Sequence, residues 1–188
     1  MIEKFHFEAL PLNGAYLIKP FYASDERGAL IKDYNVDTFR ANGIEHELKE
    51  VFYTVSHRGV IRAQHFQRVK EQAKLVRCIN GHVYDVIIDL RKDSPTFGQW
   101  LGFDLTGENR LSLYIPEGFG HGYLVIEDSV VCYQCGEVFY GEYDSGIKWD
   151  DPDMGISWPL ERIGGAENLI ISEKDKNLQS FNQFISTF

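Results

Sequence analysis

Two short segments of this sequence gather side chains that can move protons and hold negative charge. The first contains Arg62 and His65 and is followed by Lys74. The second reads Pro116-Glu-Gly-Phe-Gly-His121 and continues as Gly-Tyr. An imidazole can take a proton from carbon, a fixed ammonium can stabilise a developing oxyanion, and a guanidinium fork suits phosphate. Together these residue types could serve proton transfer on an anionic ligand that is held locally.

The spacing within the first segment constrains how its residues can share a site. On a regular extended strand His65 and Gln67 lie on one face, whereas Arg62 and Gln64 lie on the other. His65 and Arg62 therefore need different tasks unless a β-bulge intervenes between them.

The cysteines offer a competing site that the local pattern disfavours. Cys132-Tyr-Gln-Cys135 has the spacing of redox and zinc motifs, but residues 129–135 have the pattern of a strand, on which positions three apart point to opposite faces. With Cys78 as the third, the cysteines are too few for a disulfide framework. We expect neither a metal nor a redox centre here.

Composition limits the classes of protein to consider. The 188 residues are 44% hydrophobic and 14% aromatic, which predicts one globular domain over residues 1–188. A net charge of −9 argues against nucleic-acid or anionic-membrane partners. The N-terminus lacks a signal-peptide core and no long apolar run occurs, so we expect a cytoplasmic protein with no membrane association.

The elements that must position these residues are short extended runs separated by turns. Turn signals recur at intervals of about 8 to 12 residues, which is typical of an antiparallel sandwich or barrel. Asn80-Gly81 between two apolar runs predicts a tight hairpin of residues 74–79 and 82–90. Helices are expected only at residues 36–42 and after Ser172. Further strands are expected at Gln99–Leu105, Ser112–Ile115, Gly122–Ile126 and Ser129–Cys135.

The Pro-x-Gly-x-x-His spacing of residues 116–121 resembles the second signature motif of the cupin superfamily, whose fold is a small jelly roll with an interior pocket. Cupin metal sites usually take two histidines and a glutamate from the first motif. Here the position after His65 holds Gln67, so the histidine pair is missing and the site offers too few metal ligands. The sequence therefore predicts an all-β, metal-free cupin-type jelly roll with a few short helices.

A longer series of motifs resembles the dTDP-4-dehydrorhamnose 3,5-epimerase family of nucleotide-sugar enzymes. The motifs occur in the expected order from about Phe21 to Asp175. They are Asp25-Glu-Arg-Gly28, Gly59-Val-Ile-Arg62 with His65 and Gln67, Lys74-Leu-Val-Arg77, Asp89-Leu-Arg91 with Ser94-Pro-Thr-Phe-Gly98, Leu113 to Gly122, Ile147-Lys-Trp-Asp-Asp-Pro152 and Ser172-Glu-Lys-Asp175.

The resemblance implies a cofactor-independent isomerase that inverts C3 and/or C5 of a nucleoside-diphosphate 4-keto-6-deoxyhexose, in deoxysugar biosynthesis for surface polysaccharide. It makes His65 the base, Asp175 its orienting partner, Lys74 the cation beside the C4 oxygen, and Tyr133 the acid on the opposite face. Tyr140 and Tyr143 remain substitutes for Tyr133 if the loop register differs.

The resemblance also implies how the substrate is held and how the chain assembles. Arg27, Arg62 and His121 resemble positions that contact the pyrophosphate or sugar, and Gln67 and Glu50 are further candidates for substrate binding. The family usually forms homodimers by exchanging N-terminal strands, which also protects sheet edges. We therefore expect a homodimer.

Three departures from the family pattern keep other hypotheses open. Ala63-Gln64 stands where Gly-Leu is typical, Lys32 replaces a common Glu, and Glu50-Val-Phe52 replaces Gln-x-Asn. They leave room for a CDP- or GDP-linked substrate, or for inversion at one carbon only. Two other classes also remain: a non-catalytic jelly roll that binds a nucleotide sugar, and a metal-dependent cupin.

Overall fold

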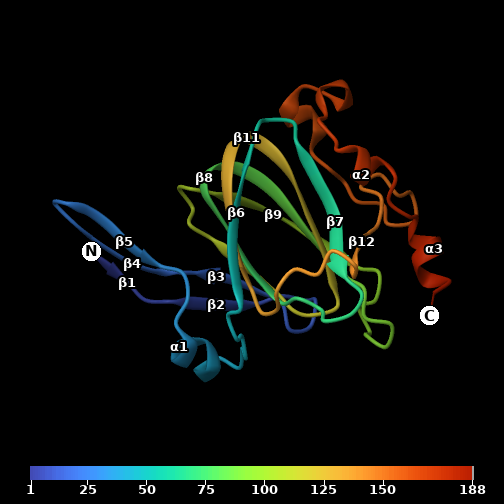
Figure 1. The fold of residues 1–188 in the computed structure, drawn as a ribbon. Helices are drawn as coiled ribbons and strands as arrows, with labels where there is room; N and C mark the ends of the chain where they lie inside the picture. The colour runs from blue at the N-terminus through green and yellow to red at the C-terminus, as the bar shows by residue number, and fades with distance from the viewer. Residues whose placement is uncertain (188) are drawn as a thin grey trace.

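Two long, bent strands, β8 (Lys74–Asp89) and β11 (Phe119–Cys135), form the frame of the fold (Figure 1). They pair antiparallel over their whole length, from Lys74 opposite Cys135 to Asp89 opposite Phe119. The structure is a computed structural model that describes residues 1–187.

Because each long strand bends, it contributes to both sheets of a barrel. The C-terminal half of β8 and the N-terminal half of β11 lie in a sheet with β9 (Trp100–Thr106), β7 (Ile61–Gln67) and β12 (Asp144–Gly146). Their other halves lie in a sheet with β6 (Glu50–Ser56), β10 (Ser112–Ile115), β3 (Tyr16–Lys19) and β2 (His6–Ala9). The predicted antiparallel jelly roll is confirmed.

The predicted hairpin at Asn80-Gly81 is wrong. Gly81 does take the positive φ expected of it, at 81°, but it lies within β8 at the bend where the pairing with β11 shifts register. A Cβ on Gly81 would lie 2.1 Å from the carbonyl oxygen of Asp128, so only glycine fits this close approach. The Asn-Gly pair forms the corner between the two sheets. The separately predicted strands 122–126 and 129–135 are likewise the two arms of β11.

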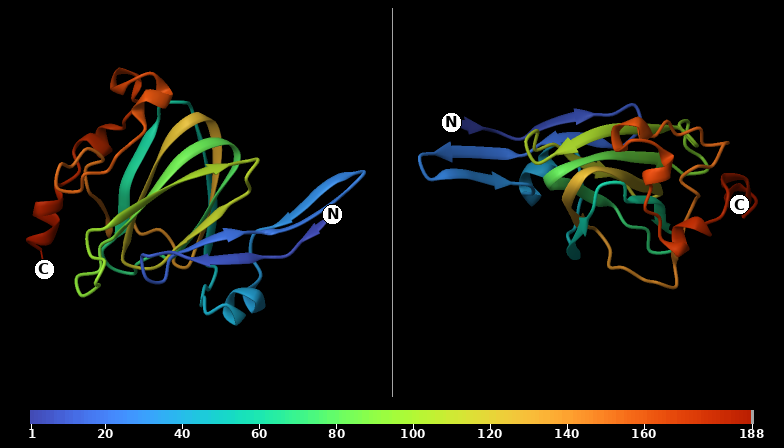
Figure 2. Two further views of the ribbon diagram at one scale, coloured as in Figure 1. Left: turned by 180° about the vertical axis from the view of Figure 1, so that it is seen from behind. Right: turned by 90° about the horizontal axis from the view of Figure 1, so that it is seen from above.

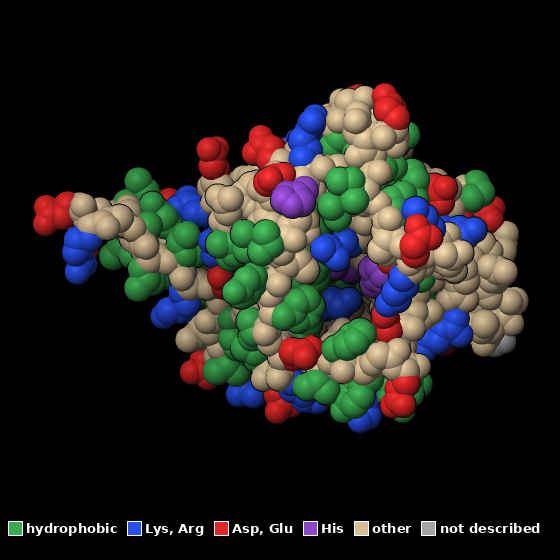
Figure 3. All heavy atoms as spheres, turned by 45° about the horizontal axis from the view of Figure 1, so that its top comes forward, with side chains coloured by type: hydrophobic (Ala, Val, Ile, Leu, Met, Phe, Trp, Pro, Cys, Tyr) green, Lys and Arg blue, Asp and Glu red, His purple; other side chains and the backbone are tan. Residues whose placement is uncertain are grey.

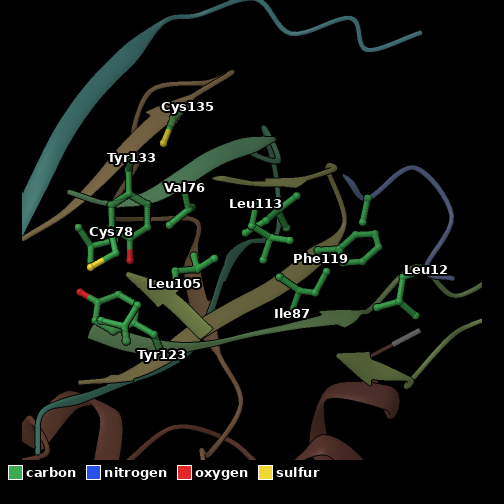
Figure 4. Close-up of a cluster of buried hydrophobic side chains, with 14 of the residues drawn as sticks. Leu12, Val76, Cys78, Ile87, Leu105, Leu113, Phe119, Tyr123, Tyr133 and Cys135 are labelled. Carbon is green, nitrogen blue, oxygen red and sulfur yellow. The ribbon is translucent and has the colours of Figure 1, made fainter. Parts of the chain in front are cut away.

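The main hydrophobic core fills the space between the sheets (Figure 4). Strand alternation supplies it: Val76 and Cys78 of β8 point inward, as do Leu113 of β10 and Val131 of β11, and all four are fully buried.

The helices cover the barrel from outside. The predicted helix at residues 36–42 is confirmed as α1 (Val36–Ala41), capped by Asn35, which accepts a hydrogen bond from the amide of Thr38. The predicted C-terminal helix is confirmed as α2 (Glu173–Lys176), capped by Ser172. The 3₁₀ segments η1 (Leu160–Ile163) and η2 (Ala166–Asn168), and α3 (Phe181–Ile185), were not expected.

A second, three-stranded sheet projects from the barrel (Figures 1 and 2). It consists of β1 (Ile2–Glu3), β4 (Phe21–Asp25) and β5 (Gly28–Lys32). Among residues 1–187 no helix has the length and apolar character needed to cross a membrane.

Candidate active site

A cavity of about 750 Å³ opens between the edges of the two sheets. Its walls come from β6, β7, β8 and β11, and the segment from Ile170 to Asp175 closes one side. Figure 3 shows a hollow in one face of the molecule, with Lys, Arg and His side chains gathered in it. The predicted residues found in the cavity wall are Glu50, Arg62, His65, Gln67, Lys74, His121, Tyr133 and Asp175.

A β-bulge in β7 brings Arg62 and His65 into the same cavity. His65 lies opposite His121 and Arg62 lies opposite Tyr123, so three steps along β7 match two steps along β11. The extra residue restores both side chains to the inner face. The Arg62 guanidinium contacts Ser56 Oγ through Nε and Nη2, each at 3.2 Å, and stays exposed at the cavity wall.

His65 is paired with a buried carboxylate from the C-terminal segment. Its Nε2 lies 3.2 Å from Asp175 Oδ2, and the two side chains are 27% and 7% exposed. Burial by itself raises the pKa of Asp175, but hydrogen bonds from His65, the Ser172 hydroxyl and the Ala63 amide, together with the imidazolium charge, outweigh it and lower that pKa. Asp175 thus stays ionised, and its carboxylate orients the His65 ring through their hydrogen bond.

Lys74 is the buried cation of the cavity. Its side chain reaches the interior from the first residue of β8 and is 8% exposed. Burial lowers the pKa of its ammonium, and the nearby Cys135, Asp144 and Asp85 partly offset this. A positive charge in such a poorly solvated position interacts strongly with a developing oxyanion.

Tyr133 lies on β11 at the wall of the same cavity, and Tyr140 and Tyr143 do not line it. The Tyr133 ring stacks on Phe52 of β6, with centroids 4.7 Å apart and planes 11° from parallel. Burial, reinforced by Tyr123 and Asp85, raises the pKa of Tyr133 well above its ordinary value. The phenol is therefore protonated at neutral pH and has a proton to give.

The remaining cavity residues have firm partners within the protein. His121 Nε2 lies 2.9 Å from Oδ2 of the fully buried Asp85. The Gln67 amide donates to the carbonyl of Lys70 and accepts from the amide of Tyr140, so it joins two loops beside the cavity. Glu50 accepts a hydrogen bond from the amide of Phe139. These contacts fix the shape of the cavity as well as its polarity.

Three of the residues thought to face the ligand do not reach this cavity. Arg27 lies in the turn of the projecting β4–β5 hairpin, where it pairs with Asp25 and is 84% exposed. Ala63 is buried in the cluster behind β7, and the Gln64 side chain is fully buried outside the cavity wall. The departure from the family pattern at Ala63 and Gln64 therefore does not change the cavity wall, because the bulge turns both side chains away from it. Lys32 also lies on the projecting hairpin.

Several cavity residues were not anticipated from the sequence. Phe52 and Thr54 line the wall because they alternate with Glu50 on β6, a period-two signal that could have identified them. Asp144 and Lys174 form an ion pair at the cavity and join β12 to α2. Only the tertiary structure brings this pair together, across 30 residues of sequence.

The two cysteines of the Cys-x-x-Cys pattern lie in different surroundings. Cys135 is buried in the main core, whereas Cys132 is outside that cluster and half-buried, as the strand pattern predicts. Burial raises the pKa of the Cys135 thiol to about 11. Within residues 1–187, no group of three or more His, Cys, Asp or Glu is placed to hold a metal ion.

Comparison with known proteins finds similarity to one family of enzymes. Residues 9–183 match the sequence family described as dTDP-4-dehydrorhamnose 3,5-epimerase. The chain is 49% identical to the dTDP-4-dehydrorhamnose 3,5-epimerase of Methanothermobacter thermautotrophicus over 94% of each chain. It superposes on the rmlC epimerase of Mycobacterium tuberculosis with a TM-score of 0.91 at 34% identity, covering 97% of this chain and 91% of that one.

A second solved structure contains a ligand. The dTDP-6-deoxy-D-glucose-3,5-epimerase of Legionella pneumophila, in complex with dTDP-4-keto-L-rhamnose, matches with a TM-score of 0.89 at 31% identity. The match covers 95% of this chain and 94% of that chain. The resemblance seen in the sequence motifs is confirmed.

Proposed function

Because the chain belongs to the dTDP-4-dehydrorhamnose 3,5-epimerase family, a family of isomerases, we propose that it inverts C3 and/or C5 of a nucleoside-diphosphate 4-keto-6-deoxysugar by proton removal and return. The observation that carries the proposal is the meeting of His65–Asp175, Lys74 and Tyr133 in one cavity.

Each residue has a distinct task in this reaction. His65 takes the proton from the carbon beside the C4 ketone and becomes an imidazolium, which Asp175 stabilises at 3.2 Å. The electron pair moves to the C4 oxygen, whose negative charge is held by the Lys74 ammonium. Tyr133 then gives its proton to the other face of the same carbon, and the configuration is inverted.

Substrate binding falls to the polar residues around this centre. Arg62 supplies an exposed guanidinium for the diphosphate, His121 lies opposite His65 for the sugar, and Gln67 and Glu50 lie in the same wall. Glu50 and Phe52 occupy the two positions where the family commonly has Gln and Asn. We expect these two residues to determine which nucleotide the protein prefers. The reaction uses no cofactor in this scheme.

One observation weakens the alternative of a non-catalytic binding protein. Ala63-Gln64 departs from the family pattern next to the base in sequence, but neither side chain lines the cavity. Binding alone also needs no buried carboxylate behind His65. A ligand-binding protein without activity is therefore the second hypothesis, favoured only by the changes at Glu50 and Phe52.

Incubation in deuterated water with dTDP-, CDP- and GDP-linked 4-keto-6-deoxysugars tests the function. Proton NMR should show deuterium at C3, C5 or both, together with the inverted product of the preferred nucleotide. Binding of a nucleotide sugar without exchange at either carbon would overturn the epimerase proposal in favour of the binding protein.

We further propose that the active form is a homodimer. The outer face of β6 exposes Val51, Tyr53 and Val55 at 56%, 70% and 69%, an apolar surface suited to a second copy of the chain. The projecting hairpin would reach across that interface and bring Arg27 to the partner's cavity. The unpaired cysteines fit a reducing compartment such as the cytoplasm.

A further inference from the structure

Behind Tyr133 lies a chain of hydroxyl groups that the proposed reaction does not yet use. Tyr123 is fully buried on β11, and its hydroxyl lies 2.7 Å from Thr54 Oγ1 on β6. Tyr123 is also among the groups that raise the pKa of Tyr133. The two rings have centroids 6.5 Å apart, and Figure 4 shows their hydroxyl groups at neighbouring positions.

The chain leads from the buried phenol back to the cavity wall. Tyr123 does not line the cavity, whereas Tyr133 and Thr54 both do. Thr54 is only half-buried, so its hydroxyl can exchange a proton with water at the wall. Phe52 stacks on one face of the Tyr133 ring and offers no proton. The Tyr123 hydroxyl is the neighbouring group that can donate one.

The proposed reaction requires that Tyr133 recover a proton after each donation. After Tyr133 has donated, its oxygen carries a negative charge in a site whose burial strongly disfavours the anion. The sugar ring bound over Tyr133 keeps water from the phenolate, so the phenolate cannot recover a proton directly from solvent while the sugar is bound. A second inversion, or a rapid next turnover, requires that the proton arrive by another path.

We propose that Tyr123 and Thr54 form a proton relay that restores Tyr133 after each donation; this rests on the proposed epimerase function. The Tyr123 O–H bond breaks as its proton moves to the Tyr133 oxygen. The Thr54 O–H bond breaks as its proton moves to Tyr123, and Thr54 takes a proton from water at the cavity wall. The imidazolium of His65 returns its own proton to solvent, so the protein ends in its starting state.

Rapid-mixing kinetics separates a relay from a structural support. The two test variants are Tyr123→Phe, which removes only the hydroxyl, and Thr54→Val, which keeps the shape of threonine without its hydroxyl. Thr54→Ser retains a hydroxyl at the same position. Tyr84→Phe is a control on β8, at a tyrosine that pairs with Leu124 and is not part of the relay. Tyr133 starts protonated, so the first two variants should form about one equivalent of product per site at the parent rate. Their steady rate should then fall about 10²-fold, as for loss of a proton-transfer group. Thr54→Ser should restore the steady rate that is lost in Thr54→Val, and Tyr84→Phe should behave like the parent.

A second readout does not require turnover. In protein labelled with ¹³C at the tyrosine Cζ, the Tyr133 resonance, identified by its loss in Tyr133→Phe, should move in Tyr123→Phe and in Thr54→Val. It should stay in place in Thr54→Ser.

The outcomes are distinct. An unchanged steady rate in Tyr123→Phe overturns the relay, as does an equal loss of the first and later turnovers, which would make Tyr123 a support for Tyr133. If the parent protein exchanges no deuterium with any sugar, the proposed function fails and the relay fails with it, even where the ¹³C shift shows that the hydroxyl chain exists.

Discussion

Gly122 lies against Ala63 at the bulge of β7: a Cβ built on Gly122 would lie 2.5 Å from the Ala63 Cβ and 2.5 Å from the Arg62 carbonyl oxygen. The bulge is what places Arg62 and His65 in one cavity. A glycine on β11 is therefore a condition for the geometry of a site built largely on β7.

Replacing Gly122 by Ala should distort the bulge and reduce both stability and turnover. Overpacking of this kind costs about 1 to 3 kcal/mol. Urea denaturation gives the free energy of unfolding, and the deuterium-exchange assay gives turnover. Gly141→Ala is the matched control, because its Cβ would meet Phe139 at an ordinary 3.7 Å. Equal behaviour of the two variants would contradict this account of the bulge.

His65→Asn and Tyr133→Phe should fail in different ways. Without His65 no proton leaves the carbon, so inversion and deuterium exchange should fall together by about 10² to 10⁴. Without the Tyr133 hydroxyl, inversion should fall while some exchange persists, because His65 can return a proton to the face it came from. Proton NMR in deuterated water measures both. Parent-like exchange by folded His65→Asn would show that another group is the base.

The Asp89 network should make stability depend on acid pH. Burial alone raises the pKa of Asp89, but hydrogen bonds from Arg91 at 2.8 Å, Ser94 and Thr96 outweigh it and hold that pKa at about 2. A folded-state pKa below the unfolded value stabilises the protein above about pH 4, and this stabilisation is lost as the pH falls toward 2.

Asp89→Asn should therefore lower the free energy of unfolding by about 2 kcal/mol at pH 7, and by progressively less toward pH 3. Chemical denaturation across this pH range measures the difference. Asp93→Asn, at an exposed position of the same loop, should have little effect at any pH. A constant deficit for Asp89→Asn across the range would mean that its charge is not what stabilises the loop.

Light scattering at micromolar concentration should give the mass of a homodimer. Tyr53→Asp places a charge on the exposed apolar face of β6 and should shift the protein toward monomer, with loss of turnover if Arg27 acts in the partner's cavity. Glu142→Lys, at an exposed position before β12, should leave the mass unchanged. A parent protein that runs as a clean monomer would refute the dimer proposal.

Chelation should leave turnover unchanged. The proposed reaction places its negative charge beside Lys74, and residues 1–187 gather no set of three metal-ligating side chains. Turnover measured before and after EDTA treatment checks this. Activity that disappears with EDTA and returns with one particular metal would favour the metal-dependent cupin class instead.

The sequence alone determined the features that depend on neighbouring residues. Turn signals on either side predicted β10 over its full length, and period-two alternation placed Cys132 and Cys135 on different faces. The local sequence also predicted helices at residues 36–42 and after Ser172, where the structure has α1 and α2. The motifs also predicted that His65, Lys74, Tyr133 and Asp175 belong to one site, although 110 residues separate His65 from Asp175.

Only the tertiary structure decided features that depend on a distant partner. Asn80-Gly81 has the same local conformational preference in a hairpin turn as in a bent strand, and the close approach of Asp128 selects the bend. The bulge at Ala63 is equally invisible locally, because it is defined by the count of residues on β11 opposite β7. Backbone preferences act between neighbours, whereas register is set by packing and hydrogen bonding between strands far apart in sequence.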